Sequence, residues 1–296
     1  MTRFSLILLT SLALIAFAGN SVLNRLALAS GSIDAASFTL VRLLSGACLL
    51  SLILLVRGLT SGEQNWINVK GSWAGALSLL GYALLFSFAY IVLDAGLGAL
   101  LLFVSVQITM LGWGLKMGER LSGMAWLGLF AALIGLFILL WPSERQMLPP
   151  LAVIAMIGSG VSWGIYSLLG RGSVDPTAQT GGNFIRASGV ALILFTVWIG
   201  IAPQFDAPLF FTPEGLVWAS LSGAVTSGLG YAIWYAVLPS LSANRAGVLQ
   251  LSVPPLAALG GILFLGEALS ARFVLASLII LGGIALATMK TPKRNR

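Results

Sequence analysis

The chain has 296 residues, of which 58% are hydrophobic and only 8% are charged, and its mean hydropathy is +1.00. Soluble globular domains carry about 25% charged residues, so this composition excludes that class and predicts an all-α integral membrane protein. The net charge of +7 comes from Lys and Arg that form no basic stripe, so we expect no nucleic-acid partner. With no histidine and one cysteine, we expect neither a metal nor a cofactor.

Charged and turn residues divide the chain into ten apolar stretches. Each is close to the ~20 residues that a helix needs to cross about 30 Å of hydrocarbon, so we predict ten transmembrane helices. The first stretch, preceded by Arg3, also imitates a signal peptide, but it continues past Asn20 and is interpreted as the first helix. The predicted helices span residues 4–24, 35–56, 71–93, 95–115, 121–141, 148–170, 177–202, 215–238, 246–266 and 273–289.

Lysines and arginines in the loops predict the orientation, because cytoplasmic loops carry the excess of positive charge. With the N-terminus inside, eleven of these residues face the cytoplasm and three face the other side. Both termini are therefore expected to be cytoplasmic, with the basic tail 291–296 against anionic membrane lipids. The eleven are Arg3, Arg57, Lys70, Lys116, Arg120, Arg171, Arg245, Lys290, Lys293, Arg294 and Arg296, and the three are Arg25, Arg145 and Arg272.

The two halves of the chain, 1–141 and 148–290, resemble each other at a spacing of about 145 residues. The segment GERLS at 118–122 recurs as GEALS at 266–270, and Arg42 is matched by Arg186. Five helices per copy is an odd number, so the second copy must enter the membrane from the opposite side. Two inverted five-helix repeats are therefore predicted, which together form one transport domain with a substrate site near the membrane midplane.

Several of these residues also carry a resemblance to a known family. Gly19-Asn20 lies late in the first helix, an arginine lies early in the second and seventh, and Gly-Glu precedes the fifth and tenth. Over its whole length the chain resembles the EamA-type members of the drug/metabolite transporter superfamily, and within it the bacterial exporters of aromatic amino acids. The resemblance implies outward transport across the bacterial inner (plasma) membrane by alternating access.

The resemblance also identifies a candidate hinge. The family's usual proline in the fourth helix of each repeat is present as Pro254-Pro255 in the ninth helix, whereas the fourth helix has Val106-Gln107 there. Because proline lacks the backbone donor that an internal turn needs, we predict a kink at these prolines. Hinging is then expected to be unequal in the two halves.

Arg42 and Arg186 are the only charged residues inside the apolar stretches. A charge in the bilayer is costly unless it faces a partner or a water-filled cavity. One interpretation makes both arginines carboxylate-binding groups in a central cavity. The other has each arginine bind backbone carbonyls of neighbouring helices or reach the interface.

Aromatic and amide side chains supply the other candidate substrate contacts. The aromatic residues recur on shared helix faces, which could line a cavity for an aromatic substrate or could simply be packing. The amides need hydrogen-bond partners in the bilayer, so they either line the path or join helices. The candidates are Tyr82, Phe86 and Tyr90 on the third helix, Trp163 and Tyr166 on the sixth, Tyr231, Trp234 and Tyr235 on the eighth, and the amides Asn20, Gln107 and Gln250.

No carboxylate lies in the middle of a predicted helix. Glu119 and Glu267 directly precede the fifth and tenth helices and are expected to cap them. Because proton-coupled carriers commonly use an intramembrane carboxylate, we predict facilitated diffusion or exchange of a small-molecule substrate. A multidrug carrier for organic cations or a nucleotide-sugar carrier is the alternative. An enzyme is not expected, because no histidine or mid-membrane acid supplies a base, and the sequence leaves monomer and homodimer open.

Overall fold

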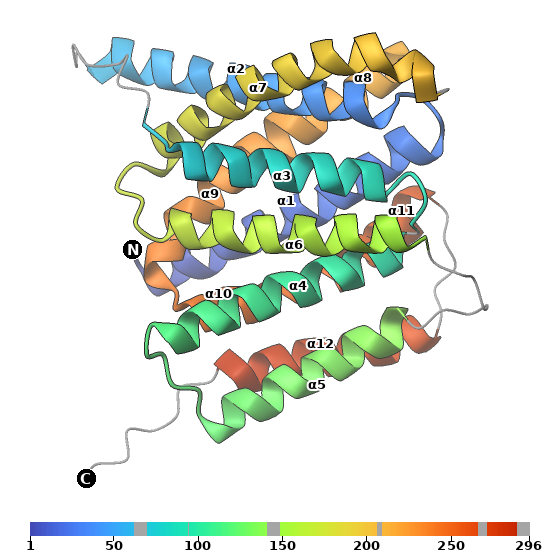
Figure 1. Cartoon of the computed structure of the whole chain (residues 1–296). Helices are drawn as coiled ribbons and strands as arrows, with labels where there is room; N and C mark the ends of the chain where they lie inside the picture. Colours follow the sequence, from blue (N-terminus) through green and yellow to red (C-terminus); the bar gives the residue numbers. More distant parts are fainter. Residues whose placement is uncertain (62–69, 94, 141–148, 206–208, 266–270, 289–296) are drawn as a thin grey trace.

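The computed structural model describes residues 1–61, 70–93, 95–140, 149–205, 209–265 and 271–288, and these ranges fold into helices. The first half contains five helices and the second half is more finely divided (Figure 1). The elements are α1 (Arg3–Ala29), α2 (Ala35–Ser61), α3 (Trp73–Ala89), α4 (Ala95–Lys116), α5 (Gly123–Leu140), α6 (Pro150–Gly170), α7 (Pro176–Ile201), η1 (Ala202–Phe205), α8 (Pro213–Leu221), η2 (Ser222–Leu229), α9 (Gly230–Val237), η3 (Leu238–Ser240), α10 (Ala243–Gln250), α11 (Val253–Leu265) and α12 (Ala271–Thr288).

Each of the ten predicted stretches is helical in its described part, with ends that differ by a few residues. The eighth stretch is a continuous rod that contains the π-helical segment η2 between α8 and α9. The ninth stretch is interrupted between α10 and α11. Within the described ranges, six helices can cross a membrane by length and composition, and four further apolar helices are shorter.

Local sequence explains where several helices begin and end. Ser72 caps α3 by accepting a hydrogen bond from the Gly75 amide at 3.0 Å, and Asp175 caps α7 through the Ala178 amide at 3.1 Å. Gly118 follows α4 with a φ of 82°, a left-handed conformation that favours glycine. The Gly-Glu signature at 118–119 therefore begins with a helix-ending turn.

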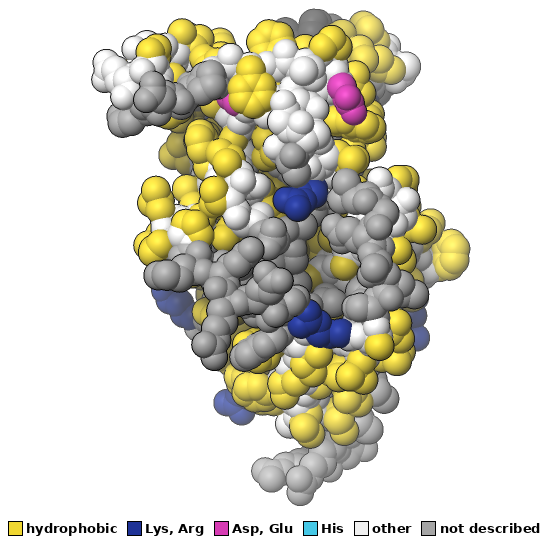
Figure 2. Space-filling view, turned by 90° about the vertical axis from the view of Figure 1, so that its right-hand side faces the viewer, with side chains coloured by type: hydrophobic (Ala, Val, Ile, Leu, Met, Phe, Trp, Pro, Cys, Tyr) yellow, Lys and Arg dark blue, Asp and Glu magenta, His cyan; other side chains and the backbone are white. Residues whose placement is uncertain are grey.

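The bundle exposes large apolar side chains on its outer surface. Examples from three helices are Phe4, Leu127 and Ile193, which are 76%, 64% and 64% exposed. Figure 2, which views one end of the bundle, shows apolar side chains along its flanks. Aromatic, amide and hydroxyl side chains instead occupy the centre. This arrangement suits a protein whose outer surface contacts lipid and whose polar groups face one another.

The described cations gather at one end of the bundle. Eight lie toward the end where α1 begins, which is also where α12 finishes (Figure 1), and two lie at the opposite end. Arg42 lies between the ends and is buried. The eight are Arg3, Arg57, Lys70, Lys116, Arg120, Arg171, Arg186 and Arg245, and the two are Arg25 and Arg272; the tail 291–296 lies outside the described residues.

Helix packing relates the two halves in a regular way. α2 packs on α7, and α5 packs on α12. α3 and α4 of the first half pack on α6, while α9 and α11 of the second half pack on α1. The contacts of α1 with the second half therefore correspond to those of α6 with the first half. Each of these two helices lies between helices of the other half.

Candidate functional site

Arg42 of α2 is the most unusual side chain in the centre, because it is 1% exposed and no described carboxylate pairs with it. Its Nε donates to Ser227 Oγ at 3.0 Å, and its Nη2 donates to the hydroxyls of Tyr82 at 3.0 Å and Tyr231 at 2.7 Å. Its Nη1 has no hydrogen-bond partner. A guanidinium has five N–H donors, so one end of this buried fork is free to bind an acceptor.

Asn20 of α1 joins the same hydrogen-bond network. Its amide nitrogen donates to the Tyr82 hydroxyl at 3.0 Å and lies 3.4 Å from the Tyr231 hydroxyl. Its amide oxygen accepts from Ser222 and Thr226. Residues from α1, α2, α3 and the rod α8–η2–α9 thus meet at one point, and four of the candidate substrate contacts, Asn20, Arg42, Tyr82 and Tyr231, are among them.

The π-helical segment η2 positions the hydroxyls of this network. Ser222 and Ser227 are fully buried and face Asn20 and Arg42 respectively. A π turn shifts the register of a helix and often marks a functional site. The sequence analysis missed both serines. Ser227 lies four residues before Tyr231, a spacing that places it on the same face and could have identified it. Ser222 lies nine residues before Tyr231, where the regular 3.6-residue period predicts the opposite face.

Aromatic rings surround the network and fill the centre. Trp163 of α6 lies 4.9 Å from the Tyr82 ring and 4.6 Å from the Tyr231 ring, measured between centroids. Phe17 of α1, which the sequence analysis also missed, contacts Trp163 at 5.1 Å. Tyr82, Trp163 and Tyr231 are at most 5% exposed. The predicted aromatic faces therefore meet, and here the rings pack against one another.

The remaining aromatic candidates extend the cluster in two directions. On α3, Phe86 lies 5.3 Å from Tyr82 and 4.6 Å from Tyr90, and the Arg42 guanidinium carbon is 5.6 Å from the Phe86 ring centroid. On the other side, Tyr166 stacks with Trp163 at 5.5 Å, Tyr235 lies 4.8 Å from Tyr166, and Trp234 donates to Ser167 at 3.1 Å. Trp234 also lies 5.5 Å from Phe17, which contacts Trp163, so the eight aromatic candidates and Phe17 form one connected group.

Arg186 lies apart from Arg42 despite the sequence match between them. Its Nη1 donates to the carbonyls of Lys70 at 2.9 Å and Gly182 at 3.0 Å, at the cytoplasmic end predicted from the charges. This geometry corresponds to the second interpretation given above, in which the arginine binds backbone carbonyls. The two arginines therefore have different kinds of partner, hydroxyl groups for Arg42 and backbone carbonyls for Arg186.

The two glutamine candidates also differ. Gln250 accepts from Trp163 Nε1 at 2.6 Å and donates to the Met110 sulfur at 3.2 Å, so it borders the aromatic group. Gln107 is 2% exposed, and neither atom of its amide has a partner. It lies near the middle of α4 and faces Gly247 of α10.

Glu119 caps a different helix from the one predicted. Its carboxylate accepts from the amides of Ala243 at 2.9 Å and Asn244 at 3.2 Å, so it caps α10, and Ser122 caps α5 instead. The expectation that Glu119 caps the helix that follows it is therefore wrong, because tertiary packing brings α10 to the turn at Gly118. Glu267 lies outside the described residues.

The ninth helix breaks more sharply than the predicted kink. α10 ends at Gln250, a turn covers 251–252, and α11 restarts at Val253 with Pro254 and Pro255 in its first turn. Prolines fit a first turn because the backbone amides there have no intrahelical acceptor.

The four described carboxylates, Asp34, Glu119, Asp175 and Glu214, all lie at helix ends. No cluster of three potential metal ligands occurs among the described residues.

Comparison with known proteins identifies the family. The model of the EamA-like transporter family matches residues 150–289. "Uncharacterized protein PA1977" of Pseudomonas aeruginosa is 50% identical over 95% of this chain and 93% of its own length. The "Probable amino-acid metabolite efflux pump" of Escherichia coli is 24% identical over 70% of this chain and 74% of its own length. The "Threonine/homoserine exporter RhtA" of Salmonella typhimurium is 29% identical over 53% of this chain and 52% of its own length.

A crystal structure of a protein that is 20% identical superposes with a TM-score of 0.72, covering 94% of this chain and 98% of the other. The fold is therefore shared with a solved protein. Together with the apolar helices and the buried polar centre, these matches identify a multi-pass membrane protein. The chain belongs to the EamA-like transporter family.

Proposed function

We propose that the protein exports aromatic amino acids across the bacterial inner membrane by alternating access, with Arg42 as the carboxylate-binding group. The observation that carries this proposal is the free Nη1 of a buried arginine within a group of aromatic rings. A carboxylate would supply the acceptor that Nη1 lacks. Two relatives named as exporters of amino acids or their metabolites support the choice of substrate class.

The aromatic side chain of the substrate would enter the group formed around Tyr82, Trp163 and Tyr231. Aromatic pairs prefer centroid distances of about 4.5–7 Å, and these three rings already lie within that range of one another. The substrate ring would then replace ring–ring contacts with similar ones. The closed packing of the centre is therefore one state of a site that opens when the helices around it move.

Alternating access would use two inverted repeats, 1–141 and 148–290. Support comes from the packing, because the contacts of α1 with α9 and α11 have counterparts in those of α6 with α3 and α4. Ten membrane crossings would return the chain to its starting side, with both termini in the cytoplasm. The eight described cations toward the end where α1 begins support this orientation.

Transport is expected to need no proton gradient, because the four described carboxylates all lie at helix ends. The test is uptake of labelled tryptophan, leucine and a quaternary ammonium dye by proteoliposomes, with and without an imposed pH gradient. We expect saturable tryptophan uptake without a gradient. Uptake of the dye alone would favour the multidrug carrier, and steep uphill uptake that requires the gradient would overturn facilitated diffusion.

The break between α10 and α11 would act as the hinge. Pro254 and Pro255 lack the donors that would close the helix onto the carbonyls of Gln250 and Leu251. The double substitution Pro254→Ala with Pro255→Ala restores both donors, so we expect a several-fold lower transport rate at an unchanged dissociation constant. Pro213→Ala, in the first turn of α8, is the matched control and should transport normally. An unchanged rate in the double variant would remove the hinge.

A further inference from the structure

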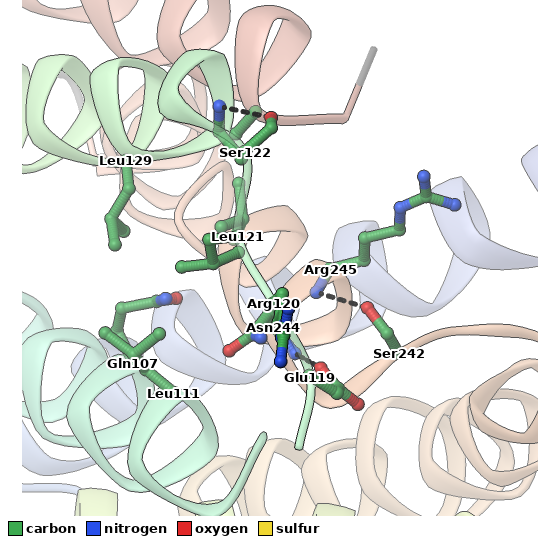
Figure 3. Close-up of a pocket in the computed structure, with 13 residues that line it drawn as sticks. Gln107, Leu111, Glu119, Arg120, Leu121, Ser122, Leu129, Ser242, Asn244 and Arg245 are labelled. Carbon is green, nitrogen blue, oxygen red and sulfur yellow. Dashed lines mark hydrogen bonds between the residues drawn. The ribbon is translucent and has the colours of Figure 1, made fainter. Parts of the chain in front are cut away.

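A cavity of 330 Å³ lies between α4, α5, α10 and α12, outside the aromatic group (Figure 3). This volume is at the lower end of the range for sites that bind small molecules, about 300–1,000 Å³. Its lining includes Glu119, which also pairs with Arg171 at 3.4 Å, and the arginines Arg120 and Arg245, and Leu111 and Leu129 form part of an apolar wall. The lining thus offers charged groups for the ammonium and carboxylate of a zwitterion and an apolar wall for a side chain.

Two buried amides in the lining have unused hydrogen-bonding capacity. Gln107 is 2% exposed with neither amide atom partnered, and Asn244 is 3% exposed with a free Oδ1. Figure 3 shows the Gln107 side chain directed into the space below Leu129. An unsatisfied buried polar group costs about 1–3 kcal/mol, so such groups point to a ligand that completes them.

The cavity is connected to the central cluster by a chain of contacts. A Cβ atom on Gly247 would lie 2.8 Å from Gln107 Oε1 and 3.3 Å from the Met110 Cβ, so these residues are neighbours. Met110 accepts from Gln250 at 3.2 Å, and Gln250 accepts from Trp163 at 2.6 Å. Side chains of α4 and α10 thus extend from the cavity to the ring that contacts Tyr82.

We propose that this cavity is a loading site that binds the zwitterion of an α-amino acid with an apolar side chain before it reaches Arg42. The inference rests on the proposed function. The ammonium group would be held by the Asn244 oxygen beside the Glu119 carboxylate. The carboxylate would accept from Arg120 and from the Gln107 amide nitrogen, and the apolar side chain would lie between Leu111 and Leu129.

The test measures whether phenylalanine protects an introduced cysteine from reaction with a membrane-impermeant maleimide. Cys48→Ser removes the native thiol, and Ala125→Cys places a thiol in the cavity wall. Saturating phenylalanine should slow the modification at least about fivefold, since a ligand in 330 Å³ covers the wall. Thr60→Cys, on the exposed end of α2, is the matched control and should show no protection.

A second comparison separates the cavity from the central site. Gln107→Leu should raise the half-protecting concentration of phenylalanine about tenfold, the equivalent of one hydrogen bond. If Gln107→Leu fails to fold, Leu129→Trp, which fills the cavity, should have the same effect. Protection should persist in Arg42→Gln. Transport without protection, or protection that is lost only in Arg42→Gln, would overturn the loading site alone. Absence of both transport and protection would overturn the proposed function.

Discussion

Arg42→Gln is expected to raise the Michaelis constant for tryptophan transport by about 10- to 100-fold. A hydrogen bond to a charged group contributes about 1.5–3 kcal/mol, and each 1.4 kcal/mol is a factor of about ten. Glutamine keeps a polar group near Ser227 and Tyr231 but removes the charge and the free Nη1. The measurement is concentration-dependent uptake into proteoliposomes, after size-exclusion chromatography has shown that the variant is folded.

Arg186→Gln is the matched control, because it is the same change at the corresponding position of the other half. That arginine binds the carbonyls of Lys70 and Gly182, so its loss should lower the melting temperature and leave the Michaelis constant within about twofold, since hydrogen bonds to carbonyls act on stability. Equal rises in the constant for both variants would contradict the separation of roles. Arg42→Lys should recover only part of the affinity, since lysine lacks the planar fork.

Helix positions were predictable because composition and length determine them. Each predicted stretch is helical where described, since a backbone in lipid must satisfy its own hydrogen bonds. The sequence did not predict the π-helical segment at 222–229 or the full break at 251–252. The π-helical segment and the break both depend on how the backbone packs against other helices, and the hydrophobicity of a segment does not determine that packing.

The site was predictable to the extent that residue type alone restricts placement. A charged or amide side chain in a membrane helix must find polar neighbours, which is why Asn20 and Arg42 meet with Tyr82 and Tyr231. Sequence alone could not separate Arg42 from Arg186, because each lies early in a corresponding helix. The difference arises from the neighbours, which are hydroxyls for one and backbone carbonyls for the other.

The close approach of α2 and η2 explains how Arg42 reaches Ser227, and it gives the second large prediction. A Cβ atom on Gly223 would lie 2.0 Å from both the Arg42 carbonyl oxygen and Ser45 Oγ. Small residues allow such contact between membrane helices. Any side chain at this position must push the two segments apart and separate Arg42 from its serine partner on η2.

Gly223→Ala is therefore expected to lower the melting temperature by roughly 5 to 10 °C, because overpacking costs about 1–3 kcal/mol. It should also lower tryptophan transport more than about tenfold, because it displaces Arg42 from its hydrogen-bond partners. Thermal unfolding in detergent and proteoliposome uptake measure the two effects. Gly189→Ala on α7 is the matched control, since a Cβ atom there meets nothing within 4 Å. It should be neutral or slightly stabilising, because alanine favours helix over glycine. If Gly223→Ala behaves like this control, contact between α2 and the π-helical segment does not hold Arg42 in place, and the arginine must be held by its tyrosine partners on α3 and α9 alone.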